Sequence, residues 1–288
     1  MEPGDPPPAK EEPQKAYGQV LLNEVNAGLA EFRRPTAGLL LSSLSGGLDV
    51  SFSLLLMATM RTLVEPSFSR AATELLVANM YAVGFIFVVI GRSELFTEHT
   101  SRALFPVLSG YASPAALARL WAIVYCGNLL GVAAFAGTLA AIGPQMGVVD
   151  DSSFEAISRR FVESPWWLTV ASAALAGWLM GLLSWLVSAC RDTISQIVIV
   201  WLVATAIGLT QLPHAIVTSG EVLANTFIGR TTVAEFLSFL LPTTLGNSLG
   251  GAFFVAALKY GHSSRSASNG DSNKLKRQSG STNQPRPT

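Results

Sequence analysis

Six long stretches of mainly apolar residues dominate this 288-residue chain. They cover residues 36–60, 72–96, 116–142, 165–190, 193–228 and 232–258. About 20 residues of α-helix cross the hydrocarbon core of a bilayer, because each residue adds 1.5 Å of rise. The pattern therefore predicts an all-α membrane protein with six transmembrane helices, in a channel domain over residues 36–258.

The composition supports a membrane protein. Charged residues make up 13% of the chain, about half of what a soluble domain carries. The formal net charge is zero, which argues against a nucleic-acid partner because such proteins need a basic face. Cys126 and Cys190 both lie in apolar runs, where we expect buried, unpaired thiols and no metal site.

The chain ends differ from the apolar block. Residues 1–16 and 259–288 are polar and are expected to be disordered, without a signal peptide. Residues 17–35 carry apolar side chains at helical spacing, which fits a helix on the membrane surface or one packed on its own protein. If both termini are cytoplasmic, 13 Lys and Arg residues lie inside and 5 outside. The positive-inside rule therefore favours cytoplasmic termini.

Two of the apolar stretches are interrupted by polar residues. The second is followed by a polar patch from Glu94 to His99 and then by a further short apolar stretch. The fifth is too long for one straight helix and is interrupted by Gln211-Leu212-Pro213-His214. Non-helical backbone survives at membrane depth only where protein or water satisfies it, so both are predicted to be broken helices at a pathway.

The two halves of the chain share a short motif. The sequence Gly-Asn-x-Leu-Gly begins at Gly127 in the third stretch and at Gly246 in the sixth, an offset of 119 residues. A similar offset of 117 places Leu95-Phe96-Thr97 on Leu212-Pro213-His214. Because each half has three predicted spans, the second half must enter the membrane from the opposite side, giving a 3+3 inverted repeat.

At these residues the chain resembles the formate/nitrite transporter family. The motifs that carry the resemblance are Glu94-Leu95-Phe96-Thr97, the His214 interruption and the paired Gly-Asn motifs. The resemblance implies an aquaporin-like fold with broken second and fifth helices, a pore through each protomer, and a homopentamer in a bacterial inner membrane. It also implies a proton-coupled or channel-type pathway for formate, nitrite, acetate or a similar anion, with no cofactor and no enzymatic activity. By resemblance the pathway residues are Tyr81, Phe85, Leu95, Phe96, Thr97, Ile207, His214 and Asn247.

The chain departs from the family pattern in two places. Arg92 precedes Ser93 and Glu94 where common members have a small residue. The loop between the third and fourth spans lacks the Lys that many members carry, and Arg159 or Arg160 is the candidate substitute. These differences are typical of a divergent subgroup, and they bear on the substrate more than on the fold.

His214 is the residue with the clearest expected chemistry. An ionisable side chain inside a membrane segment is usually functional, because its burial in hydrocarbon is costly. An imidazole at the midplane can donate a hydrogen bond or a proton to an anion, which lowers the cost of crossing apolar constrictions. Thr97 is expected to bond the same substrate or to cap a helix, and the opened helix N-termini add positive partial charge.

The remaining polar residues at membrane depth are expected to support the breaks. Asn128 is predicted to be structural, and Asn247 to contact the pore or the His214 loop. The charged residues Asp49, Arg92, Glu94, Glu98 and Glu221 must be paired, protonated or hydrated. One hypothesis pairs Arg92 with Asp49 or Glu94. Another lets Glu221, two helical turns beyond His214, tune that histidine or pair with Arg92.

Other classes of membrane protein fit less well. Aquaporin-type channels carry Asn-Pro-Ala at both breaks, and this tripeptide is absent from the sequence. A membrane enzyme needs clustered ligands or nucleophiles, whereas the three histidines are scattered at positions 99, 214 and 262. A channel for another small neutral or cationic solute, or a structural protein of the same fold, remains the alternative.

Overall fold

The computed structural model describes residues 15–257, so most of the two tails expected to be disordered lie outside the described residues. Within that part the regular secondary structure is helical. The α-helices are α1 (Tyr17–Arg33), α2 (Thr36–Val50), α3 (Phe52–Val64), α4 (Arg70–Gly91), α5 (Phe96–Arg102), α6 (Leu104–Leu108), α7 (Pro114–Ile142), α8 (Asp151–Glu163), α9 (Trp166–Ala189), α10 (Thr193–Thr210), α11 (Val217–Phe227) and α12 (Val233–Leu249).

Five helical segments are long and apolar enough to cross a membrane: Thr36–Val64, Arg70–Gly91, Pro114–Ile142, Trp166–Ala189 and Thr193–Thr210. The first combines α2 and α3, which meet at Ser51. The expected sixth segment is present as α12, which contains Pro242 and continues into a π-helix over Gly250–Ala257. The winding thus changes within the segment, and α12 alone is 17 residues long.

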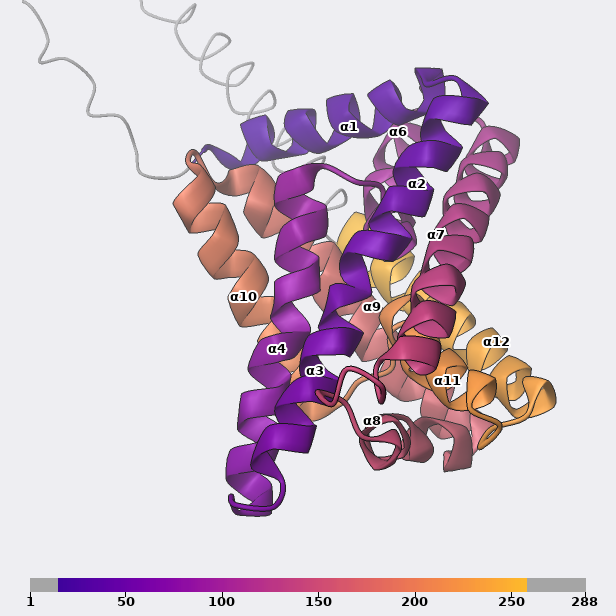
Figure 1. The fold of residues 1–288 in the computed structure, drawn as a ribbon. Coiled ribbons are helices and arrows are strands. Elements are labelled where there is room, and N and C mark those ends of the chain that lie inside the picture. The colour runs from indigo at the N-terminus through magenta and orange to yellow at the C-terminus, as the bar shows by residue number, and fades with distance from the viewer. Residues whose placement is uncertain (1–14, 258–288) are drawn as a thin grey trace, which may run out of the picture.

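The long helices run between two ends of the molecule (Figure 1). Helix α1 lies across one end, and the short helix α8 lies at the opposite end, so these two helices name the ends below. Val20 and Val25 of α1 cluster with Phe105 and Trp185. The apolar face of α1 therefore packs on its own protein, which is one of the two expectations for residues 17–35.

Glycines allow the closest helix contacts. A Cβ atom on Gly47 of α2 would overlap the carbonyl oxygen of Asn128 in α7, and one on Gly177 of α9 would overlap that of Asn247 in α12. The two pairs stand at equivalent places of the two halves. In both pairs the backbones touch, and the Asn side chain beside the contact can therefore reach groups across the interface.

Both helix breaks begin in the same way. Helix α4 ends at Gly91 and α10 at Thr210, and each is followed by a non-glycine residue in left-handed conformation, Arg92 (φ 58°) and Gln211 (φ 51°). The equivalent residues are 119 apart, as are the two Gly-Asn motifs. The expected offset of 117 at the breaks is therefore wrong, and Leu95 rather than Thr97 corresponds to His214.

The cysteines are less buried than expected. Cys126 is exposed and Cys190 is half-buried, and neither forms a disulfide. The prediction of two buried thiols is thus wrong, because Cys126 lies on a face of α7 that the rest of the protomer leaves uncovered.

Candidate functional site

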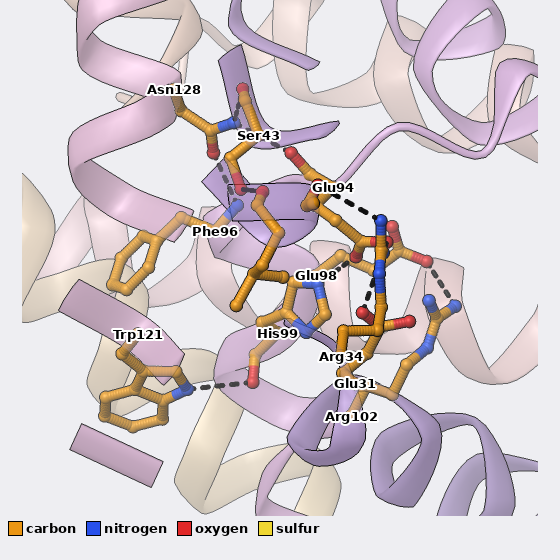
Figure 2. A network of polar contacts seen from close by, with 12 residues as sticks. Glu31, Arg34, Ser43, Glu94, Phe96, Glu98, His99, Arg102, Trp121 and Asn128 are labelled. Atoms are coloured by element: carbon orange, nitrogen blue, oxygen red, sulfur yellow. Dashed lines mark hydrogen bonds and ion pairs between the residues drawn. The ribbon is translucent and has the colours of Figure 1, made fainter. Parts of the chain in front are cut away.

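Two buried asparagines hold the two broken segments by the same set of hydrogen bonds. The Asn128 amide donates to the carbonyl oxygens of Ser43 and Glu94, both at 2.7 Å, and its Oδ1 accepts from the Phe96 N–H at 2.8 Å. Figure 2 shows Asn128 reaching Ser43 and Phe96. The amide thus supplies partners for backbone groups that the break removes from helical hydrogen bonding.

Asn247 repeats this arrangement in the second half. Its amide donates to the carbonyl oxygens of Ala173 at 2.8 Å and Pro213 at 3.0 Å, and its Oδ1 accepts from the Ala215 N–H at 2.7 Å. The loop partners correspond at the offset of 119. Asn247 therefore contacts the backbone on both sides of His214 and leaves the imidazole to other partners.

The two broken segments meet at Thr97 and His214. The Thr97 Oγ1 and His214 Nε2 atoms are 2.7 Å apart, and both side chains are fully buried. On the other side of the ring, Nδ1 accepts the backbone N–H groups of Ile216 at 3.3 Å and Val217 at 3.2 Å. Because Nδ1 is an acceptor, the proton of the neutral ring lies on Nε2 and is donated to Thr97.

This geometry changes two expectations. Thr97 makes no side-chain capping bond to α5, whose N-cap is Leu95, so its hydroxyl is directed to the histidine instead. The first N–H groups of α11 are taken up by Nδ1. The N-terminus of α11 therefore orients the imidazole, and the expected effect of its positive partial charge on the substrate stays a prediction.

Apolar rings from α4 lie next to the histidine. Phe85 packs edge-to-face on His214 with ring centroids 5.2 Å apart, and Tyr81 lies 5.2 Å from Phe85. Ile207 and Leu95 are fully buried. The structure thus brings Tyr81 and Phe85 into a row that ends at His214, and their role as constrictions stays a prediction.

Phe96 points elsewhere. Its ring packs against Tyr125 at 4.8 Å and Trp121 at 6.1 Å, both on α7. The Phe96 ring therefore contacts α7, whereas the Phe96 backbone N–H donates to Asn128.

A cleft opens toward the α8 end. Its polar lining consists of Arg61, Glu74, Tyr81, Gln211, Thr218 and Glu221. Ile207 also lines it, so the cleft adjoins the row of apolar side chains. Thr218 accepts a hydrogen bond from the backbone N–H of His214 at 3.1 Å, which links the cleft wall to the histidine loop.

Arg160 of α8 reaches the second break. Its guanidinium donates to the Gln211 side-chain oxygen and to the Gln211 carbonyl oxygen, the latter at 2.7 Å. Burial lowers the pKa of Arg160 somewhat, and an arginine so shifted still carries its charge. Arg159 instead pairs with Glu163 on the exposed face of α8. Of the two candidates, Arg160 is therefore the residue next to the cleft.

A second charged network lies at the α1 end (Figure 2). The Glu94 carboxylate is bonded to Arg34, at the C-terminal end of α1, and to His99 of α5. Arg102 pairs with Glu98 and lies 3.8 Å from Glu24 of α1. These contacts fasten α1 to the segment that follows the first break.

The pairings proposed for Arg92 are wrong. Arg92 is exposed and forms no ion pair with a described residue. Asp49 accepts from Ser93 at 2.6 Å, and Glu94 binds Arg34. Glu221 lies in the cleft at the α8 end, whereas Arg92 caps α4 near the α1 end, so these two cannot pair either. These pairings are wrong because Arg34, at the end of α1, supplies the cation for Glu94 that Arg92 in the loop was expected to supply.

One group of possible metal ligands occurs among the described residues. The ligand atoms of Glu31, Glu94 and His99 lie within 4.8 Å of one another. Arg34 is bonded to both carboxylates, so its guanidinium already supplies the positive charge there. The arrangement therefore fits an ion-pair network.

Two residues of the site were not predicted from the sequence to be functional. Gln211 was noted only as part of an interruption, although it stands 119 residues after Arg92 and shares its backbone conformation. Arg61 of α3 bonds Glu74 of α4 at 2.6 Å and lines the cleft. No sequence pattern links Arg61 to the cleft, because the contact depends on how α3 packs against α4.

Comparisons with known proteins show which family the chain resembles and which fold it shares. The family model described as "Formate/nitrite transporter" matches residues 18–261. The chain is 30% identical over 237 residues to the "Inner membrane protein YfdC" of Escherichia coli (strain K12), an alignment covering 81% of this chain and 74% of that protein.

Two solved structures share the fold. One is titled "FNT family ion channel" and matches with a TM-score of 0.74 at 23% identity, covering 86% of this chain and 98% of the other. The second is titled "Pentameric formate channel with formate bound" and matches with a TM-score of 0.65 at 22% identity, covering 78% and 96%.

Proposed function

The chain belongs to the formate/nitrite transporter family, and from this membership we propose that it conducts small monovalent anions such as formate and nitrite through a pore in each protomer. The family is one of transporters and channels, and no step of the proposed function makes or breaks a covalent bond in the substrate. The observation that carries the proposal is the 2.7 Å contact between Thr97 and His214, which joins the two broken segments.

The proposed role of His214 is to give a hydrogen bond to the anion. Its Nε2–H group is bonded to Thr97, and an anion between these side chains can accept from both the imidazole N–H and the hydroxyl. Such donors replace part of the hydration that the anion loses among apolar side chains. The hydrogen bonds are stronger there than in water because the surroundings have a low dielectric constant.

Hydrogen bonding suits this ring better than donation of a proton. The neutral ring would become an imidazolate if it released its Nε2 proton, and an imidazolium requires a second proton on Nδ1. Two backbone N–H groups already point at Nδ1, so a proton there would face two donors. Any proton that accompanies the anion therefore has another source in this proposal.

The oligomeric state and the membrane location are proposed from the same family membership. The protomer has exposed apolar side chains on its long helices, among them Trp166 (70% exposed), Trp167 (60%) and Leu241 (68%). Such faces suit lipid and neighbouring subunits. We propose a homopentamer, as in the formate channel structure, in a bacterial inner membrane with both termini in the cytoplasm.

The test is uptake of isotope-labelled formate into proteoliposomes, with nitrite and acetate as competitors. We expect saturable uptake by the wild-type protein and a loss of about 10- to 100-fold in His214→Asn, since a hydrogen bond to a charged group contributes roughly 1.5–3 kcal/mol. Size-exclusion chromatography shows whether both proteins assemble alike. Uptake of ammonium or glycerol without formate uptake would instead favour a channel for another small solute.

A further inference from the structure

Glu221 is a buried carboxyl group that the proposed pathway leaves without a role. Its side chain lines the cleft at the α8 end, and the residue is 3% exposed. It receives no hydrogen bond and forms no ion pair within the described residues. A carboxylate buried without a partner is costly, whereas the neutral acid is much less so.

Tyr81 faces the same cleft and is also unpartnered. The residue is 3% exposed, and its hydroxyl oxygen is buried without a hydrogen-bond partner in the described part of the chain. Two polar groups that line one cleft and have no protein partners point to a ligand or water between them. A phenol and a carboxylic acid can each donate one hydrogen bond.

The charged groups around Glu221 are already engaged elsewhere. Arg61 of α3 is bonded to Glu65 and to Glu74 of α4. Arg160 of α8 interacts electrostatically with Glu221 but bonds Gln211. The lining of the cleft contains no titratable side chains besides Arg61, Glu74, Tyr81 and Glu221.

The cleft lies beside the central histidine, because Tyr81 of its lining packs on Phe85 and Thr218 bonds the His214 N–H. Glu221 lies seven residues beyond His214, in the first part of α11, with Thr218 between them on the cleft wall. The rings of Tyr81 and Phe85 on α4 are 5.2 Å apart, and Phe85 is 5.2 Å from the His214 ring. A ligand held by Tyr81 and Glu221 therefore lies directly beside the apolar constriction.

We propose that Tyr81 and the neutral carboxylic acid of Glu221 form a binding subsite for a small monovalent anion at the α8-end entrance, and that ionisation of Glu221 closes it. Both hydroxyl protons are donated to the anion, while Arg160 adds a nearby positive charge. When Glu221 is ionised, it loses its donor and repels the anion. The inference rests on the proposed function, since it names a second binding position on the same pathway.

The test compares formate flux of the wild-type protein, Glu221→Gln and Glu163→Gln in proteoliposomes at equal pH on both sides, from about pH 6 to 10. Gln keeps the shape of the neutral acid and donates through its amide. Glu163 is the matched control, because it is a carboxylate of the same end with a 60% exposed side chain. Ratios to wild type at each pH remove the change in the neutral fraction of formate.

We expect the Glu221→Gln to wild-type ratio to rise about tenfold per pH unit above the transition, while the Glu163→Gln ratio stays constant. Tyr81→Phe should raise the KM for formate and keep the wild-type pH profile. A constant ratio for Glu221→Gln, or loss of its flux at every pH in a correctly assembled pentamer, would overturn the proposal.

An infrared measurement separates this proposal from the proposed function. The C=O stretch of a buried carboxylic acid should be present in the wild-type protein at low pH, vanish as pH rises, and be absent from Glu221→Gln. Absence of the titrating band contradicts the neutral acid whatever the transport result. A titrating band in a protein that transports no formate instead counts against the proposed function, with Glu221 still shown to be a neutral acid.

Discussion

Arg92 and Gln211 occupy the same position of the two broken helices, 119 residues apart, and both adopt the left-handed backbone conformation that favours glycine. The residue after each of them makes the same backbone hydrogen bond. The Ser93 N–H donates to the Val88 carbonyl and the Leu212 N–H to the Ile207 carbonyl, both at 3.1 Å. Their side chains differ in their contacts: Gln211 bonds Arg160 and Glu74, whereas Arg92 forms no ion pair with a described residue.

This difference predicts opposite effects of glycine at the two breaks. Arg92→Gly should stabilise the protein by about 1 kcal/mol, since glycine relieves the left-handed strain and Arg92 has no ion pair with a described residue to lose. Gln211→Gly should not stabilise, because the side chain accepts from Arg160 and donates to Glu74 at 3.0 Å. Thermal unfolding of the two variants in detergent checks this, and equal shifts would contradict it.

The two asparagines should matter equally to stability. Asn128→Leu and Asn247→Leu each remove three buried hydrogen bonds and leave loop backbone groups unsatisfied. We expect each to lose about 3 kcal/mol or more in unfolding free energy. Asn79→Leu is the control, because Asn79 is partly exposed and should cost less than 1 kcal/mol. A marked difference between Asn128 and Asn247 would argue against the equivalence.

Substitution by alanine should distinguish glycines that touch a neighbouring helix from glycines that have open space beside them. Gly47→Ala and Gly177→Ala place a methyl group on a neighbouring backbone carbonyl and should prevent assembly or reduce expression. Gly38→Ala, also in α2, meets no atom within 4 Å and should stabilise by about 0.5–1 kcal/mol. The yield of folded oligomer after solubilisation distinguishes them. Normal assembly of Gly177→Ala would show that α9 and α12 can move apart.

The ion pairs at the α1 end should behave differently from those on α8. Arg102→Met leaves Glu24 and Glu98 buried without their cation and should destabilise by about 3–5 kcal/mol. Arg159→Met removes a pair whose two side chains are more than half exposed and should cost less than 1 kcal/mol. Unfolding by denaturant measures both. Similar small losses would mean that water already reaches Arg102.

The Thr97 hydroxyl should be needed for flux and dispensable for folding. Thr97→Val keeps the shape and removes the partner of His214 Nε2, so formate flux should fall about 10- to 100-fold. Thr97→Ser restores the hydroxyl and should recover most of the flux. The pair is measured in the uptake assay above, with oligomer size as control. Equal flux in both variants would show that the hydroxyl is not required.

Much of the architecture could be predicted from local features of the sequence. Hydrophobic length located the apolar helices, and polar interruptions located both breaks, because each of these depends on a short stretch of chain. Placing the repeat also worked for Gly127-Asn128 and Gly246-Asn247. At the breaks the predicted offset was two residues too small. There Leu95 and His214 are at equivalent positions, but their side chains have different chemistry.

The chain's own sequence thus determined where helices form, where they break and which residues are polar at those breaks. Only the tertiary structure decided which partner each polar group has. Arg34 rather than Arg92 neutralises Glu94 because α1 folds back over that end, and Arg160 forms no ion pair with Glu221 because its guanidinium donates to Gln211. Such pairings join residues far apart in sequence, and their energies depend on distance and burial, which no periodicity encodes.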